Sequence, residues 1–176
     1  ESCADTCAVF VASGDDGSDG KQVSFPASVP LCVACGGTNT RGAAWSGSGG
    51  GFSKLYLKPA HQVGAQLTTQ RMRGVPDVCA VSTPDYQIRC QGKKTWVGGT
   101  SAAAPLWAAF AACLNASGGG RKRAMGAFLY SNPGGFTDVV SGNNGDYRTA
   151  PGWDPVTGLG APSWSRLVAA WVGPPP

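Results

Sequence analysis

One serine stands where a helix is predicted to begin, a position that suits a nucleophile. Ser101 follows Gly98, Gly99 and Thr100 and precedes a run rich in alanine, leucine and tryptophan. Unpaired backbone N–H groups at a helix start can stabilise a developing oxyanion or lower the pKa of a nucleophile, and glycine lets a substrate backbone approach closely. The alternative is that Ser101 or Thr100 only caps the helix, which is a common role.

Few acid–base groups are available to activate such a serine. The chain has a single histidine, His61, and a single glutamate, Glu1. A Ser-His-Asp hydrolase would therefore have to use His61 as its base. Asp15 follows Ser13 and Gly14 in a tight turn after a short apolar run, where an aspartate commonly bonds its own backbone.

The cysteines indicate an oxidising compartment. Seven in 176 residues favour a secreted or vesicular protein, and the odd number leaves at least one thiol free or bonded to another chain. Cys32 and Cys35 have the spacing of a redox or zinc pair, but on the strand predicted there they face opposite ways. Cys79 and Cys90 flank a Pro-Asp turn, so a disulfide bond between them could close a hairpin.

Strands that alternate with helices predict an α/β domain with a mostly parallel sheet. Apolar runs and turn signals predict strands at residues 8–13, 29–35, 75–81 and 86–90. Helices are predicted at residues 102–116, with Pro105 in the first turn, at 123–130 and at 163–172. A Gly/Ser-rich loop at 42–53 and a long irregular segment at 131–162 lie between them. An irregular segment of that length usually carries function or binds an ion.

Composition excludes several classes of protein. Charged residues are 14% of the chain, and the net charge is +4. The basic residues are spread along the sequence and form a cluster only at residues 121–123. A nucleic-acid-binding protein usually shows a longer basic stripe. No apolar run reaches the length of about 18 residues that a membrane span needs. The 27 glycines and 13 prolines predict many turns, while 42% hydrophobic content argues against disorder.

The string from Gly98 to Trp107 resembles the nucleophile motif of the sedolisins, which are serine-carboxyl peptidases with a subtilisin-like fold that work in acid. Further segments resemble the family in the same order; they are residues 13–17, 25–30 with 36–38, 49–53, 73–78, and 136–139 with 152–160. The resemblance implies a subtilisin-like, mostly parallel sheet with flanking and central helices. It also implies that residues 1–176 are the C-terminal portion of a catalytic domain whose N-terminal half is absent.

The resemblance implies a role for each matching residue. Ser101 would be the nucleophile, which forms an acyl-enzyme. Asp15 would donate a hydrogen bond to the oxyanion, so it must be protonated when it works. The residues that would line the substrate cleft are Gly49, Gly50, Gly51, Gly99 and Thr100.

The loop at 136–160 resembles the calcium loop of the family. Asp138 and Asp154 would give carboxylate oxygens, and backbone carbonyls of Val139, Ala150 and Gly152 would complete most of the shell. All-oxygen ligation suits Ca²⁺. The family commonly has glycine where Ala150 stands, which a backbone carbonyl ligand tolerates. The alternative is a surface loop rich in Asx turns.

The chain departs from the family in its proton relay. Sedolisins activate the serine with a Glu and an Asp spaced E-x-x-x-D on one upstream helix, which places both carboxylates on one face. Glu1 and Asp5 have this spacing, but Asp5 lies only ten residues before Asp15, whereas the family has the pair far upstream of this turn. We therefore expect the pair in a missing N-terminal chain or segment of the same enzyme, to which the odd cysteine could form a disulfide.

The leading interpretation is an acid-acting peptidase chain with a peptide or protein substrate, secreted or held in a lysosome- or vacuole-like compartment. A second interpretation is a non-catalytic binding or structural module that kept the fold. A third is a Ser-His-Asp hydrolase that uses His61 near neutral pH.

Overall fold

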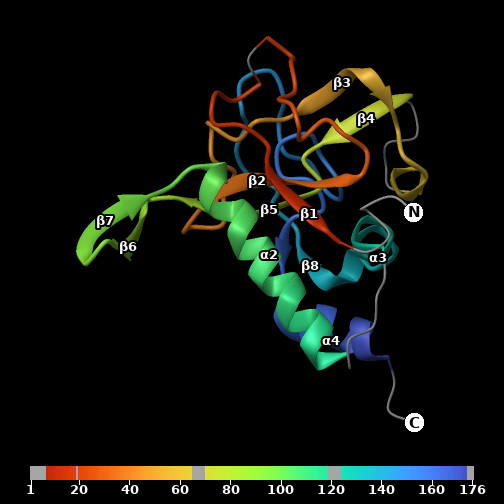
Figure 1. Cartoon of the computed structure of the whole chain (residues 1–176). Coiled ribbons are helices and arrows are strands. Elements are labelled where there is room, and N and C mark those ends of the chain that lie inside the picture. The colour runs from red at the N-terminus through yellow and green to blue at the C-terminus, as the bar shows by residue number, and fades with distance from the viewer. Residues whose placement is uncertain (1–6, 19, 65–69, 119–123, 174–176) are drawn as a thin grey trace.

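A three-stranded parallel sheet forms the centre of the computed structural model, which describes residues 7–18, 20–64, 70–118 and 124–173 (Figure 1). Its strands are β1 (Val9–Ala12), β2 (Cys32–Asn39) and β5 (Val78–Thr83), in the order β1-β2-β5. All three run parallel, as predicted. In the described part of the chain, β1 has one unpaired edge.

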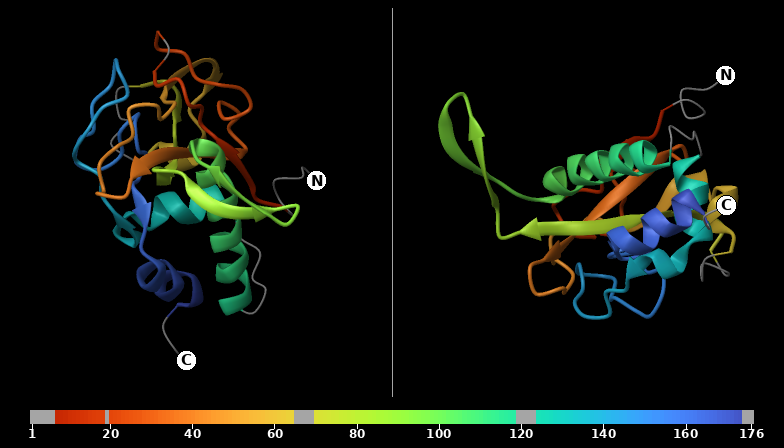
Figure 2. Two further views of the ribbon diagram at one scale, coloured as in Figure 1. Left: turned by 90° about the vertical axis from the view of Figure 1, so that its left-hand side faces the viewer. Right: turned by 90° about the horizontal axis from the view of Figure 1, so that it is seen from below.

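The predicted central helix packs along this sheet. Helix α2 (Thr100–Ser117) buries alanines against the strands, and small side chains let it lie close to them (Figures 1 and 2). Its Trp107 is buried and donates from Nε1 to the Cys79 carbonyl at 2.9 Å. The helix begins two residues earlier than predicted, so Pro105 is its sixth residue and lies in the second turn, not the first.

Two more helices complete the core. Helix α3 (Met125–Ser131) and helix α4 (Trp164–Val172) join the cluster of buried side chains that α2 and the sheet form. The rings of Phe128 and Trp171 meet edge to face with centroids 4.6 Å apart. Both helices were predicted within two residues. No described helix has the length and apolarity that a membrane crossing requires.

Short antiparallel ribbons lie around the core. Strand β3 (Gly51–Leu57) pairs with β4 (Met72–Val75), and β6 (Tyr86–Cys90) pairs with β7 (Lys93–Val97). The long segment after α3 contains a 3-10 turn, η2 (Pro133–Gly135), and closes where β8 (Phe136–Thr137) pairs with β9 (Ala161–Pro162).

The prediction of a Cys79–Cys90 disulfide across a hairpin is wrong. Strand β6 pairs with β7 and not with β5, because β5 belongs to the parallel sheet and the chain leaves the sheet after it. Cys79 is fully buried in β5, Cys90 is exposed, and both are free thiols. Burial raises the pKa of both Cys35 and Cys79, which disfavours the reactive thiolate form of these two side chains. No group of three or more potential His, Cys, Asp or Glu metal ligands occurs among the described residues.

A buried ion pair fixes the ends of several elements. Arg73 in β4 donates to Asp77 at 2.7 Å and 2.5 Å, and both side chains are buried. Asp77 also accepts from Tyr130 Oη at 2.8 Å and Gln62 Nε2 at 3.0 Å. Since a buried charge is tolerated only when it is paired and hydrogen-bonded, this cluster serves the fold.

Candidate active site

The nucleophile candidate stands at the start of helix α2. Gly99 has φ 72° and ψ −179°, and this left-handed turn begins the helix at Thr100. Its N–H donates to the Ser82 carbonyl at 2.9 Å, which ties the turn to β5. Ser101 is the second helical residue and is exposed. Its backbone N–H belongs to the first turn, where no intrahelical acceptor exists.

The structure brings Asp15 to this helix start. Asp15 Oδ1 accepts hydrogen bonds from Thr100 N and Thr100 Oγ1, each at 2.7 Å. Asp15 therefore caps helix α2 from a turn 85 residues away in sequence. The other oxygen lies over Gly99, where a Cβ would stand only 2.3 Å from Asp15 Oδ2. Oδ1 is thus engaged as an acceptor, and no described residue donates a hydrogen bond to Oδ2.

The Thr100 side chain contacts Asp15 and is not exposed at the predicted cleft. It is fully buried, and its hydroxyl lies 3.1 Å from the Gly14 carbonyl and accepts from the Gly14 N–H at 3.2 Å. The sequence predicted Thr100 either as a residue of the cleft or as a cap of the helix, and not as a partner of Asp15. The sequence hinted at the contact between Thr100 and Asp15 only through the position of this threonine next to the candidate nucleophile.

The predicted cleft glycines lie against the same turn. The Gly49 N–H donates to the Gly14 carbonyl at 2.8 Å, and a Cβ on Gly49 would stand 2.2 Å from the Ser13 carbonyl oxygen. A Cβ on Gly50 would stand 2.0 Å from the Pro155 carbonyl oxygen, and Gly51 has φ 140°. The glycines therefore allow the loop to pack between these two segments.

We expect Gly99→Ala to lower kcat/KM by about 100-fold, since small displacements of a catalytic group have effects of that order. A methyl group there collides with Asp15 Oδ2, and the left-handed φ adds backbone strain. The matched control is Gly42→Ala, because Gly42 has φ 80° and no atom within 4 Å of the position that its methyl group would take. Kinetics and thermal melting of both variants test this. Equal kcat/KM losses in the two variants would contradict the clash with Asp15.

The structure brings together four of the five residues predicted to bind calcium, through backbone N–H groups and not through the predicted carbonyl ligands. Asp138 Oδ2 accepts from Gly152 N at 2.8 Å, and Asp154 Oδ2 accepts from Ala150 N at 3.1 Å. Both carboxylates thus converge on residues 150–152. The fifth, Val139, directly follows Asp138 and is buried.

Asp154 is the unusual member of this loop. It is 2% exposed, and burial raises its pKa, although N–H donors from Thr157, Ala150 and Val156 act in the opposite direction. All its hydrogen-bond donors are neutral, and the one ion pair among the described residues joins Arg73 to Asp77. A buried carboxylate with neutral partners fits a nearby cation. The same N–H contacts are also those of an Asx-turn loop, so calcium remains a prediction.

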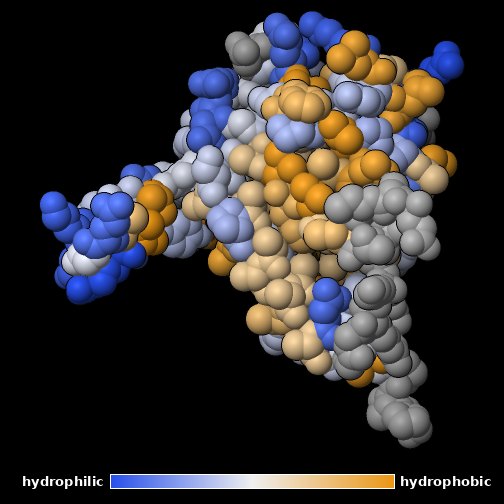
Figure 3. All heavy atoms as spheres, in the orientation of Figure 1, coloured by the Kyte–Doolittle hydropathy of each residue, from blue (hydrophilic) through white to orange (hydrophobic). Residues whose placement is uncertain are grey.

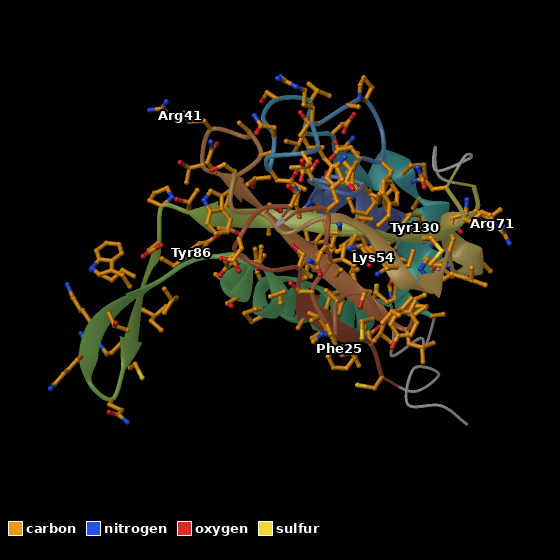
Figure 4. All side chains as sticks on the ribbon, turned by 90° about the horizontal axis from the view of Figure 1, so that it is seen from above. Phe25, Arg41, Lys54, Arg71, Tyr86 and Tyr130 are labelled. Carbon is orange, nitrogen blue, oxygen red and sulfur yellow. The ribbon has the colours of Figure 1, made fainter. Side chains whose placement is uncertain are left out.

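The structure does not bring His61 to Ser101. His61 lies in the 3-10 turn η1 (Ala60–Gln62), and its ring packs on Tyr130 with centroids 5.2 Å apart. Burial lowers its pKa. Tyr130 lies on the opposite side of the body from Tyr86, which precedes the nucleophile segment (Figure 4). The other predicted carboxylates, Glu1 and Asp5, lie outside the described residues.

Comparisons with known proteins point to one group of peptidases. Kumamolisin of Bacillus sp. (strain MN-32) is 37% identical over an alignment of 197 positions that covers 92% of this chain and 36% of that protein. Tripeptidyl-peptidase sed4 of Aspergillus fumigatus is 33% identical and covers 95% of this chain and 36% of that one. The chain therefore spans about a third of the length of these curated relatives. No protein-family model matches the chain.

A solved structure agrees with the sequence relatives. Pseudomonas sedolisin, a serine-carboxyl proteinase complexed with two molecules of pseudo-iodotyrostatin, superposes with a TM-score of 0.77 at 28% identity. The match covers 90% of this chain and 54% of that chain. This likeness confirms the predicted subtilisin-like fold.

Proposed function

This chain belongs to the sedolisin family and matches the C-terminal portion of its relatives, and from that premise we propose that it carries the nucleophile of a serine-carboxyl peptidase. One observation carries the proposal: Thr100 holds Asp15 Oδ1 at 2.7 Å at the start of the helix on which Ser101 is exposed. A nucleophile, a carboxylic acid and unpaired helix N–H groups thus meet at one point.

In the proposed reaction, Ser101 Oγ attacks the carbonyl carbon of a peptide bond and loses its proton to a carboxylate base. The oxyanion receives hydrogen bonds from protonated Asp15 Oδ2 and from backbone N–H groups at the start of α2. The amine leaves with a proton, and Ser101 becomes an ester. Water then hydrolyses this acyl-enzyme and restores the hydroxyl. Asp15 can donate only when protonated, which fits work in acid.

The carboxylate base is proposed to come from outside this chain. An upstream segment with a Glu and an Asp spaced E-x-x-x-D would continue the sheet beyond the unpaired edge of β1. Intact mass of the native protein, with and without reductant, tests this. A second polypeptide or a longer chain that carries such a helix supports the proposal, and its appearance only after reduction adds a disulfide. A single 17.9 kDa species favours the non-catalytic alternative.

Calcium is proposed to bind in the loop at 136–160 with Asp138, Asp154 and carbonyls of Val139, Ala150 and Gly152 as ligands. Bound there, it would supply structural stabilisation of a loop that packs against the cleft glycines. Removal with a chelator is expected to lower Tm by several degrees, because a ligand held at about 100 times its Kd stabilises the folded state by about 2.7 kcal/mol.

Variants make the calcium experiment specific. Asp138→Asn is expected to abolish the response to the chelator. The exposed Asp146, which is bonded to Ser18 at 2.8 Å, provides the control, and Asp146→Asn is expected to keep the response. If the chelator leaves Tm unchanged and elemental analysis finds no metal, the proposed calcium site is contradicted.

Activity against a fluorogenic peptide between about pH 3 and pH 7 tests the proposed function and its alternatives. We expect turnover on the acid side and little effect of His61→Ala, because the His61 ring packs on α3. A neutral optimum lost in His61→Ala would favour the histidine-dependent hydrolase. No turnover in a protein that contains the E-x-x-x-D helix would favour a binding module. The peptidase proposal places the protein outside the cell or in an acidic vesicle.

A further inference from the structure

The ribbon of β6 and β7 stands away from the body of the protein (Figures 1 and 2). Its strands pair from Tyr86 opposite Val97 to Cys90 opposite Lys93, and they are joined by Gln91 and Gly92, both with positive φ. A two-residue turn of this kind is the common connection in a hairpin. Isolated two-stranded ribbons gain little stability on their own, so this one is suited to a role in contact with another molecule.

The base of the ribbon is fixed beside the candidate nucleophile. Tyr86 Oη donates to the Val81 carbonyl at 2.8 Å, which anchors the ribbon to β5 (Figure 4). On the other strand, Val97 is followed directly by Gly98, and a Cβ on Gly98 would stand 2.0 Å from Asp85 Oδ1. The first strand therefore leaves the sheet and the second leads into the start of α2, at the end of the molecule that carries Ser101.

The outer part of the ribbon is basic. Arg89, Lys93 and Lys94 are exposed, and residues 86–97 contain no acidic side chain. Arg89 lies directly opposite Lys94 in the pairing. Like charges at directly opposite positions destabilise a ribbon. In the described part of the chain, none of these three side chains forms an ion pair.

An aromatic side chain shares the basic face. Gln87 pairs with Trp96 and Arg89 with Lys94, so these four residues lie on one face of the ribbon. Trp96 is 62% exposed. Arginine and tryptophan are enriched where proteins bind other proteins. The hydropathy surface shows the hydrophilic tip and a hydrophobic patch between it and the body (Figure 3).

We propose that the β6–β7 ribbon is a binding site for an acidic segment of a protein substrate. The inference rests on the proposed function, since it takes Ser101 as the site of cleavage. The carboxylates of an acidic segment can form ion pairs with Arg89 and Lys94, which have no acidic partner in the described part of the chain. Apolar side chains of the same segment can cover Trp96. Five strand residues span about 16 Å, so the acidic segment lies several residues from the scissile bond.

The test measures binding without turnover. A fluorescein-labelled peptide of eight glutamates, and its glutamine counterpart, are titrated with the native protein carrying Ser101→Ala, at about pH 6.5, where glutamate is ionised. The ribbon variant combines Arg89→Gln and Lys94→Gln, the two cations on the face of Trp96. The control combines Arg41→Gln and Arg71→Gln, two exposed cations elsewhere, and so removes the same charge.

We expect the glutamate peptide to bind, the glutamine peptide to bind far less, and the ribbon variant to lose about tenfold in affinity, as two exposed charge pairs allow. The control variant is expected to lose less than about twofold. Equal losses in the two variants, or no binding of the glutamate peptide, would overturn the proposal. Because the readout is independent of catalysis, neither result bears on Ser101 as the nucleophile.

Discussion

Replacement of Ser101 by alanine is expected to lower kcat by about a millionfold, which is the order reached when a serine nucleophile is removed. The reason is that no neighbouring group can take over the attack. The adjacent hydroxyl of Thr100 is fully buried and engaged with Asp15 and Gly14. Steady-state kinetics on a peptide substrate at acid pH measure the loss.

The fold should survive this substitution. Ser101 is exposed, and exposed substitutions usually change the free energy of unfolding by less than about 0.5 kcal/mol. Ser117→Ala at the other end of the same helix is the control, since Ser117 Oγ only donates to the Cys113 carbonyl at 3.0 Å. Substantial turnover in the Ser101 variant, or an equal loss in the Ser117 variant, would refute the assignment of the nucleophile.

Substitution of Asp15 by alanine is expected to lower kcat by about 100- to 1000-fold, the effect of one lost oxyanion donor. Alanine also removes the acceptor for Thr100 N and Thr100 Oγ1, so the start of α2 loses a cap worth about 1 kcal/mol. Kinetics and thermal melting separate the two effects. A large loss of stability with unchanged kcat would show that Asp15 serves the helix alone.

Asparagine at the same position is the informative companion. Asp15→Asn keeps an oxygen for Thr100, and its amide donates at any pH, whereas a carboxyl donates only when protonated. We therefore expect the Asn variant to retain more activity than the Ala variant and to lose less of it as pH rises. Asp16→Asn is the control, because Asp16 is an exposed neighbour in the same turn. Identical pH profiles for wild type and Asp15→Asn would contradict the donor role.

Much of the parallel sheet and the helices could be predicted because their signals are local. The apolar runs gave β1 and β5, and the alanine-rich run gave α2. Strand β2 lies later than predicted, at 32–39 instead of 29–35, because its glycines belong inside it. A Cβ on Gly37 would stand 2.8 Å from Trp45 Cε3, so Gly37 makes room for a side chain that no local pattern reveals.

Strand β6 was predicted at residues 86–90 and is confirmed there, whereas its partner β7 and the Asp15 contact could not be predicted, for different reasons. Strand β7 carries Lys93 and Lys94, and its exposed faces lack the alternation that marks a half-buried strand. The bond from Thr100 to Asp15 spans 85 residues and depends on the left-handed turn at Gly99. The resemblance to the family predicted that Asp15 and Thr100 share one site. It did not predict that Thr100 donates hydrogen bonds to Asp15.

The most direct test of the account is to trap and locate the acyl-enzyme. The native protein is mixed with a peptide ester substrate, quenched in acid during turnover, digested with trypsin and analysed by tandem mass spectrometry. We predict the mass of the acyl group on Ser101, within the tryptic fragment of residues 95–121, and its absence in Ser101→Ala. An acyl group on another residue, or turnover with an unmodified Ser101 fragment, would contradict Ser101 as the nucleophile.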